Sequence, residues 1–488
     1  MNAVILLLFV IWTVLFTTRN ITRRKDSLTE EERRRLDEPL FLTPFLDAND
    51  TEKARHLSRV TLFEEGYGVG AHSGYITIDK TLGSHLFFLL TKTKHSFPDE
   101  APLILWTFGG PGVSSLLGPL LFNGPFTLDA QGRLVAASPA SGQLQSFAHV
   151  LYLDHPVGSG YSFAEQEGDD RTFAKSIDDA VDAVDDFLCQ FELLFPEFRG
   201  RQFYFAGESY SARDAFGFAN RYHGKGVKTS LKLAGIMSGA GFIAPLLRAA
   251  NPAKFLLQLG LIDVHGRRLL DEKFRQMKES VDDEEIIVAL LLLREVFTKT
   301  EEDGPSLFES LTGFRHRASA LHSTEPPEFA TYRKYVTSED FKRAIHVGVN
   351  ATMDRQRNIV STTLYSYDAF KDVRELMATV LDKQRVLVYG GNMDVVYPAD
   401  DVYGFLRSLQ WKGEEDLRVA SRRPYRNASA AGGRCSPRQG SVDLRCSSPS
   451  RGSATERRRF APQSHRNSRG EGRTGTDQTQ EVKWWATK

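Results

Sequence analysis

The sequence predicts an α/β fold in which a mostly parallel sheet carries helices on both faces. Short apolar runs typical of buried strands, such as residues 102–106 and 150–153, alternate with longer helical stretches. Between Phe173 and Phe195, apolar residues recur every three or four positions, which predicts one face of a long helix. A further apolar run, residues 203–206, leads through a tight turn into a predicted helix over 212–222.

That turn, Gly207-Glu208-Ser209-Tyr210-Ser211, has the pattern of a nucleophile elbow. The backbone at the serine is strained, so small residues are needed two positions before and after it. Gly207 meets that need fully and Ser211 less well. The geometry would expose the Ser209 hydroxyl and direct the Tyr210 amide at a developing oxyanion. The alternative is a serine in an ordinary strand-to-helix turn.

The composition of the chain limits its domain count and its classes of partner. The chain has 488 residues, 41% hydrophobic and 25% charged, which suits one large or two medium globular domains. Lys+Arg and Asp+Glu both number 62, so the whole chain has no charge bias toward nucleic acid or membranes. With three cysteines, no disulfide framework can be argued. We expect no metal and no cofactor.

The N-terminus predicts entry into the secretory pathway. An apolar run over residues 3–16 suggests a signal peptide, residues 1–18, followed by a charged leader, residues 19–37. The run is short for a membrane span, so we expect no stable span, and an uncleaved anchor is the alternative. The final compartment would be extracellular or a lysosomal or endomembrane lumen. Acceptor triplets for N-glycosylation begin at Asn20, Asn49, Asn350 and Asn427.

The middle of the chain predicts one domain, residues 38–417, with an insertion. Residues 58–90 alternate in places and suggest antiparallel strands. The block 245–345 is charged and poor in strand signals, so we expect a mainly helical cap over the carboxyl edge of the sheet. Strand and helix signals return at 385–389 and 402–409.

Four motifs follow one another along the chain. They are Gly109-Gly110-Pro111-Gly112-Val113-Ser114-Ser115, Asp154-His155-Pro156-Val157-Gly158-Ser159-Gly160-Tyr161-Ser162, Gly207-Glu208-Ser209-Tyr210 and Gly391-Asn392-Met393-Asp394. In this order they resemble the serine carboxypeptidase family. Residues 39–44, 57–60 and 344–348 are similar to its vitellogenic-like branch, and the resemblance covers roughly residues 38–415.

The resemblance implies an α/β-hydrolase fold and release of C-terminal amino acids from peptides that have a free C-terminus. Ser209 would be the nucleophile and Asp394 would orient the catalytic histidine. The amides of Gly110 and Tyr210 would form the oxyanion hole, and Gly109 and Glu208 would bind substrate. The oligomeric state does not follow from the resemblance.

Two departures from the family pattern concern the substrate's carboxylate. Family members have an asparagine before the two glycines, where this chain has Phe108. They also have a later glutamate that pairs with the acid beside the nucleophile, here Glu208, and in this chain Phe122 takes the place of that later glutamate. Because phenylalanine cannot donate a hydrogen bond, a bound carboxylate would be desolvated without compensation. After the elbow, residues 211–214 also replace the expected small residues.

The third departure is the catalytic histidine, which follows the aspartate in hydrolases of this order. The sequence after Asp394 contains a single histidine, His465, and its surroundings do not resemble the family's glycine-flanked histidine. His155 and His346 lie in family-like stretches but are expected to be structural. We therefore identify no triad histidine. Without a base, Ser209 is a poor nucleophile.

Three functions remain open. The first is a serine carboxypeptidase by descent that is impaired in this chain. The second is a secreted, non-catalytic hydrolase-like protein that binds peptides or partners through a remodelled cleft. The third is nucleic-acid binding through the Arg-rich C-terminal tail, residues 418–488. We rank it last, and we expect no nucleic-acid partner.

The tail is rich in Arg, Ser and Gly and has no hydrophobic period, so it is expected to be disordered. We predict that it is a product of wrong splicing or a shifted frame, and that the natural chain ends in a Gly-rich turn carrying the triad histidine. Reading the transcript and genomic DNA beyond the Leu417 codon in three frames tests this. A transcript that confirms the printed tail, with no such segment nearby, contradicts it.

Overall fold

The computed structural model describes most of the chain between residues 35 and 420 and one short C-terminal strand. The expected signal peptide and most of the charged leader lie outside the described residues, as does most of the tail. Within the described part, no helix has the length and apolarity needed to cross a membrane. The described ranges are 35–94, 97–138, 143–243, 250–298, 304–420 and 483–487.

The described residues divide into two compact units. The first contains the chain as far as Leu233 and then Glu325–Ala369, and the second contains Ala234–Thr324 and the chain from Phe370 onward. The division places the predicted nucleophile Ser209 in the first unit and Asp394 in the second.

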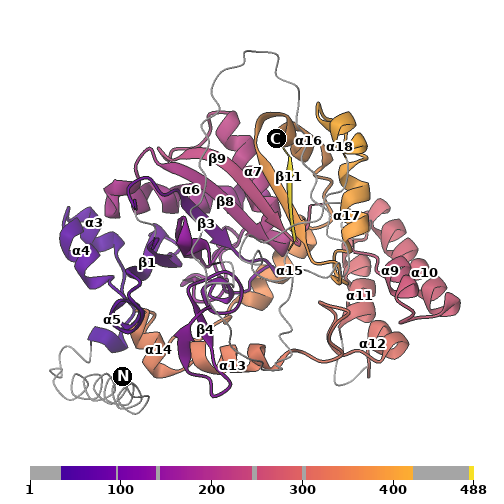
Figure 1. Ribbon diagram of the computed structural model, residues 1–488, viewed down its shortest axis with the longest axis horizontal. Helices are drawn as coiled ribbons and strands as arrows, with labels where there is room; N and C mark the ends of the chain where they lie inside the picture. The colour runs from indigo at the N-terminus through magenta and orange to yellow at the C-terminus, as the bar shows by residue number, and fades with distance from the viewer. Residues whose placement is uncertain are drawn as a thin grey trace, which may run out of the picture. The chain divides into compact units, whose positions relative to one another are not determined.

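The first unit has a sheet with the order β1-β2-β6-β3-β8 (Figure 1). β6, β3 and β8 are parallel to one another, and Thr107 at the end of β3 pairs with Gly207 on β8. β1 and β2 form the expected antiparallel pair, and β2 is also antiparallel to β6. These strands are β1 (Ala71–Asp79), β2 (Ser84–Thr91), β3 (Leu103–Thr107), β6 (His149–Leu153) and β8 (Gln202–Glu208).

The long predicted helix is α6 (Ile177–Leu194), which packs against β1 and against α7 (Ala212–His223). Ser176 caps its N-terminus by accepting a hydrogen bond from the Asp179 amide at 3.2 Å. The periodic apolar residues within the helix are buried, as predicted, except Ile177 at its first position, which is half-buried. Phe173 was predicted to lie on the helix but precedes it, because the N-cap at Ser176 sets the start of α6 at Ile177.

At residues 61–67 the sequence prediction was wrong. This stretch was expected to be part of an antiparallel strand pair, but it forms helix α5 (Thr61–Tyr67). The helix ends at Gly68, whose left-handed φ of 64° suits glycine. Phe63 is fully buried and stacks on Phe126 at a centroid distance of 4.3 Å, so tertiary packing decided the conformation.

The remaining elements of the first unit are short helices, short strands and helical turns, of which the last three helices belong to residues 325–369. They are α3 (Thr43–Asp47), α4 (Thr51–Leu57), η1 (Gly118–Phe122), β4 (Phe126–Leu128), β5 (Leu134–Ala136), η3 (Leu144–Ser146), β7 (Phe163–Ala164), η4 (Pro196–Phe198), η5 (Ser209–Ser211), α13 (Pro327–Val336), α14 (Glu339–Ala344) and α15 (Arg357–Tyr367).

The second unit has a parallel pair, β9 (Lys232–Gly239) and β10 (Val386–Gly390), and β10 is the strand that the sequence predicted at residues 385–389. β11 (Lys483–Thr487), from the tail, pairs antiparallel with β10. Helix α18 crosses the expected start of the tail. The helices of this unit are α9 (Ala253–Gln258), α10 (Val264–Asp282), α11 (Ile286–Phe297), α12 (Leu307–Thr312), α16 (Arg374–Lys383), α17 (Ala399–Leu406) and α18 (Glu414–Val419).

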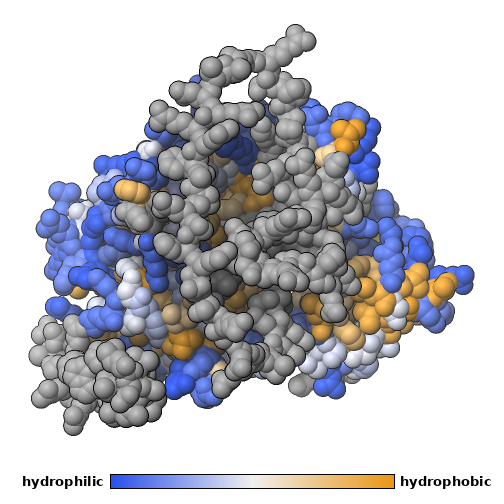
Figure 2. All heavy atoms as spheres, viewed as in Figure 1, coloured by the Kyte–Doolittle hydropathy of each residue, from blue (hydrophilic) through white to orange (hydrophobic). Residues whose placement is uncertain are grey.

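The described residues of the expected cap block are mainly helical. They form α9 to α12 in the second unit and α13 and α14 in the first. Helix α11 is apolar over most of its length and buries Ala289 and Val296. Ile287 and Leu291 on the same helix are 62% and 58% exposed. Figure 2 shows an apolar area where α11 lies.

Two helical glycines give a matched test of the α6–α7 packing. A Cβ at Gly217 in α7 would lie 2.1 Å from Ile177 Cγ2, whereas a Cβ at Gly404 in α17 would meet no atom within 4 Å. Alanine is a better helix former than glycine by about 1 kcal/mol. We expect Gly404→Ala to raise the free energy of unfolding by up to that amount and Gly217→Ala to lower it by about 1–3 kcal/mol. Denaturant unfolding measures both, and equal effects would contradict the packing.

Candidate active site

The first unit builds the predicted elbow at the end of β8. Glu208 is extended, Ser209 has a left-handed φ of 57°, and α7 begins at Ala212. A Cβ at position 207 would lie 2.2 Å from the Ser211 carbonyl oxygen, so glycine is required there. The strained serine between a strand and a helix is the geometry that exposes a nucleophilic hydroxyl.

The loop after β3 lies directly against this turn. A Cβ on Gly109 would lie 2.3 Å from the Tyr210 amide nitrogen and 2.9 Å from the Glu208 carbonyl oxygen. Gly110 has a φ of 116°, and the Tyr365 hydroxyl donates to its carbonyl at 3.2 Å. The structure thus brings together the four sequence-predicted residues Gly109, Gly110, Glu208 and Tyr210 beside Ser209.

Asp154, at the end of β6, holds the loop in place. Its carboxyl group accepts hydrogen bonds from the Ser115 amide at 2.6 Å, the Tyr161 amide at 2.7 Å and the Ser114 hydroxyl at 2.9 Å. Burial raises the pKa of Asp154 to about 7, against the opposing effect of these hydrogen bonds. The aspartate therefore has a structural position under the loop.

A buried ion pair fastens the elbow to the end of α15. The Arg213 Nε donates to Asp368 Oδ2 at 2.8 Å, and the Tyr210 hydroxyl donates to the same oxygen at 2.7 Å. The Arg213 side chain is fully buried and also donates to the Asp368 carbonyl at 2.9 Å. Sequence reasoning noted Arg213 as a departure but missed its partner, which lies 155 residues away.

A second buried group links the elbow to β3. The Ser211 hydroxyl lies 2.6 Å from the Thr107 hydroxyl and donates to Asp214 Oδ2 at 3.0 Å. His155 Nε2 lies 3.6 Å from the same carboxyl oxygen. Burial raises the pKa of Asp214 to about 7 and lowers the pKa of His155 to about 3. A protonated carboxyl beside a neutral imidazole avoids burying charge.

The second unit holds Asp394, in the turn after β10. Its Oδ1 accepts hydrogen bonds from the Val396 amide at 2.8 Å and the Tyr397 amide at 2.9 Å. Burial raises the pKa of Asp394 to about 7. The segment is tied to its own unit, because the Ala320 amide donates to the Met393 carbonyl at 2.8 Å.

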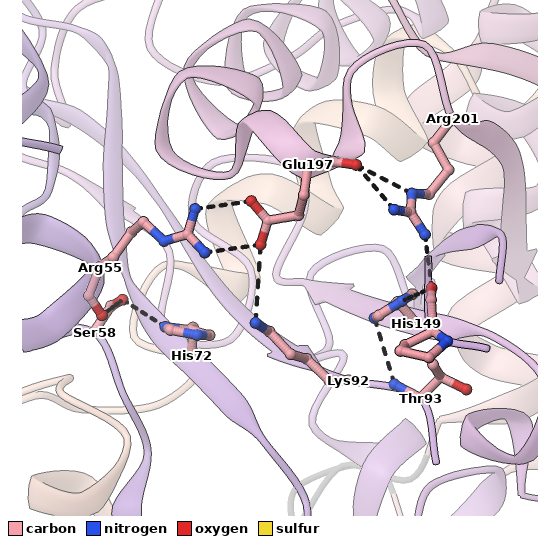
Figure 3. Close-up of polar contacts among 9 residues, drawn as sticks. Arg55, Ser58, His72, Lys92, Thr93, His149, Glu197 and Arg201 are labelled. Atoms are coloured by element: carbon pink, nitrogen blue, oxygen red, sulfur yellow. Dashed lines mark hydrogen bonds and ion pairs between the residues drawn. The ribbon is translucent and has the colours of Figure 1, made fainter. Parts of the chain in front are cut away.

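The buried histidines of the first unit have structural surroundings. His72 contacts the Ser58 hydroxyl at 2.9 Å, as Figure 3 shows, and His149 contacts the Pro98 carbonyl at 3.0 Å. Burial, followed by the positive charge of Lys92, lowers the pKa of His72 to about 3. His346 contacts the Ser73 hydroxyl at 2.9 Å. The candidate His465 lies outside the described residues.

The charged side chains around these histidines are themselves paired. Glu197 binds Arg55 through both carboxylate oxygens, at 2.8 and 2.9 Å, and Lys92 lies 3.8 Å from it (Figure 3). Arg201 donates to the Glu197 and Pro98 carbonyls. This arrangement joins α4, η4 and the end of β2, which is a structural role.

The geometry of the elbow agrees with the comparison with known families. A family model described as serine carboxypeptidase matches residues 63–439. The chain belongs to the serine carboxypeptidase family. It is 32% identical over 392 residues to a venom serine carboxypeptidase of Apis mellifera, covering 79% of this chain and 81% of that protein. It is 29% identical over 392 residues to a vitellogenic carboxypeptidase of Aedes aegypti, covering 80% and 81%.

The fold of this serine carboxypeptidase family member is also that of a solved structure. The crystal structure of Kex1(Δ)p, a prohormone-processing carboxypeptidase from Saccharomyces cerevisiae, aligns with a TM-score of 0.57 at 22% identity. The alignment covers 71% of this chain and 78% of that one. The predicted α/β-hydrolase class, with a mostly parallel sheet flanked by helices, is confirmed.

The buried carboxyl of Asp214 gives a pH prediction. Because its pKa is raised in the folded state, the folded chain keeps this proton between about pH 4 and pH 7 where the unfolded chain has lost it. The stability that Asp214 contributes is therefore present below pH 4 and lost as the pH rises through 7. We expect the free energy of unfolding of the wild type, minus that of Asp214→Asn, to fall by about 1 kcal/mol or more between pH 4.5 and pH 7.5.

Denaturant titrations at several pH values measure this difference. The Asn variant cannot ionise, so the subtraction removes the contribution of the other titrating groups, including His155. A difference that stays constant, or that rises with pH, would show that Asp214 is ionised in the folded protein.

Proposed function

We propose that this chain is a serine-type peptidase that acts at the C-terminal end of peptides through an acyl-enzyme on Ser209. One observation carries the proposal: Ser209 has the strained elbow backbone while the Gly109-Gly110 loop packs against the Tyr210 amide. The Gly110 and Tyr210 amides would donate to the oxyanion that forms when the Ser209 oxygen attacks a peptide carbonyl. Gly109 and Glu208 would contact the substrate.

Turnover requires a base to take the Ser209 proton, and we propose that the catalytic activity of this chain is impaired because that base is missing. Asp394 would orient a histidine in the family's triad, but His465 is the sole histidine that follows it in the sequence. The described histidines named above occupy structural environments. Ser209 therefore stays protonated and attacks slowly.

A second candidate function has its own support. Phe108 and Phe122 stand where the resemblance predicts polar groups, and their rings stack 5.8 Å apart at 16°. An apolar surface beside the elbow suits a non-catalytic protein that binds peptides or a partner. A fluorophosphonate probe separates the candidates, because slow labelling of Ser209 supports residual acyl chemistry and no labelling supports binding alone.

The proposed location is the secretory pathway. The apolar run near the N-terminus supports it. Two of the glycosylation acceptors, Asn49 and Asn350, are exposed, as attachment of a glycan requires.

We expect the purified full-length chain to release C-terminal residues from peptides at a rate about a millionfold below that of a serine peptidase with a complete triad. The reason is the missing base. Mass spectrometry of peptide digests measures the release, and His465→Ala is expected to leave any residual rate unchanged. Robust release that Ser209→Ala abolishes would contradict the impairment.

A further inference from the structure

Helix α11 of the second unit has an apolar stripe on its exposed side. Ile287, Val288 and Leu291 are 62%, 41% and 58% exposed, whereas Ala289 and Val296 are fully buried. Leu291 follows Ile287 by four positions and Val288 by three, so the three exposed side chains share one face of the helix. The stripe contributes to a surface of the kind that marks interaction sites, because its apolar side chains are grouped and not scattered singly.

The inner side of α11 is fixed against the neighbouring helices. Phe297, at the end of α11, meets Phe274 on α10 at 6.2 Å and Phe308 on α12 at 6.3 Å between ring centroids. Phe274 and Phe308 are themselves buried. The stripe therefore lies on a rigid support, and a partner can bind it without rearrangement of the helix.

Charges of opposite sign lie at the two ends of the stripe. Residues 282–285, just before α11, read Asp-Asp-Glu-Glu, and all four are exposed. At the other end, Arg294 is exposed as well. Neither Glu284 nor Arg294 forms an ion pair with another residue that the structure describes, so both are available to a partner.

This charge pattern favours a protein partner over a membrane. Helices that lie on membranes are rich in Lys and Arg around their apolar face, because the lipid surface is anionic. Here the turn of residues 282–285 would place four acidic side chains at that surface. A partner that suits the stripe must be apolar in the middle, basic at one end and acidic at the other.

A second copy of α11 has this pattern when the two helices are antiparallel. With Ile287 of one copy opposite Leu291 of the other, each residue faces the one equally far from position 289 on the second copy. Arg294 lies five positions after 289 and Glu284 five positions before it, so these two face each other. A twofold interface repeats each contact, which gives two such pairs.

One pair of like charges arises in the same register. Asp283 would face Glu295 of the second copy. Lys273 on α10 pairs with Glu295 at 2.8 Å, so the charge of that glutamate is already compensated. The two contacts between Glu284 and Arg294 are therefore the main electrostatic contribution to this register.

We propose that the exposed face of α11 binds a second copy of this chain through an antiparallel pair of α11 helices. The inference goes beyond the proposed function, because it involves neither Ser209 nor a substrate. Three apolar side chains supply only part of the roughly 800 Å² that each partner buries in a standard interface. The dimer is therefore weak, with an expected dissociation constant on the order of 10 μM.

Sedimentation equilibrium of the full-length chain measures the dissociation constant of the dimer. We expect Leu291→Ser to raise this constant at least about tenfold, because it places a hydroxyl in the centre of the apolar contact. Leu321→Ser is the matched control, because Leu321 lies in the same unit and is 60% exposed, and it is expected to change nothing. A chain that stays monomeric up to about 200 μM overturns the proposal, as do equal effects of the two variants.

Exchange of the charges tests the antiparallel register. Glu284→Arg and Arg294→Glu each place like charges opposite each other twice, so each is expected to raise the dissociation constant several-fold, and more so at low salt. The double variant restores opposite charges and is expected to return the constant to within about twofold of the wild type. A double variant that binds no better than either single variant overturns the register. Thermal unfolding of each variant shows that it is folded.

Vesicles test the membrane as the competing occupant. The wild type and Leu291→Ser are mixed with vesicles of phosphatidylcholine, with and without phosphatidylserine, and cosedimentation is measured. We expect the two proteins to behave alike, because the stripe does not bind lipid. Cosedimentation of the wild type that Leu291→Ser abolishes, in a chain that shows no dimer, would overturn the proposal and assign the stripe to a lipid surface.

Discussion

The candidate site depends on two places where no Cβ can exist. At Gly207 a side chain would collide with the Ser211 carbonyl, and at Gly109 it would collide with the Tyr210 amide. These contacts involve backbone atoms, which cannot move aside as a flexible side chain can. Glycine at 207 lets the elbow turn tightly, and glycine at 109 lets the β3 loop approach the elbow, which places two candidate oxyanion donors beside Ser209. The left-handed backbone of Ser209 is tolerated because its surroundings hold it on both sides.

Buried polar contacts provide that support. Tyr210 and Arg213 both bind Asp368, while Ser211 connects Thr107 to Asp214. Breaking one partner of a buried ion pair costs several kcal/mol because the other charge is left without compensation. The first helical turn after Ser209 is therefore joined to β3 on one side and to the segment after α15 on the other.

The glycines, the strained serine and the Asp154 contacts under the loop form a rigid backbone arrangement of the kind that a preorganised acyl-transfer site requires. Beside it, Phe108 and Phe122 stack at a centroid distance of 5.8 Å. Stacking and apolar burial of these rings stabilise this side of the fold without polar contacts.

Local patterns in the sequence determined the strands β3, β6, β8 and β10, the long helix α6, the elbow and the family, because hydrophobic period and short motifs depend on neighbouring residues. They also identified Phe108 and Phe122 as departures. Only the tertiary structure decided that residues 61–67 are helical, that the two phenylalanines stack, and that Arg213 and Asp368 pair. Those outcomes join residues 14 to 155 positions apart, or depend on burial of a side chain such as Phe63, and packing of this kind leaves no local period in the sequence.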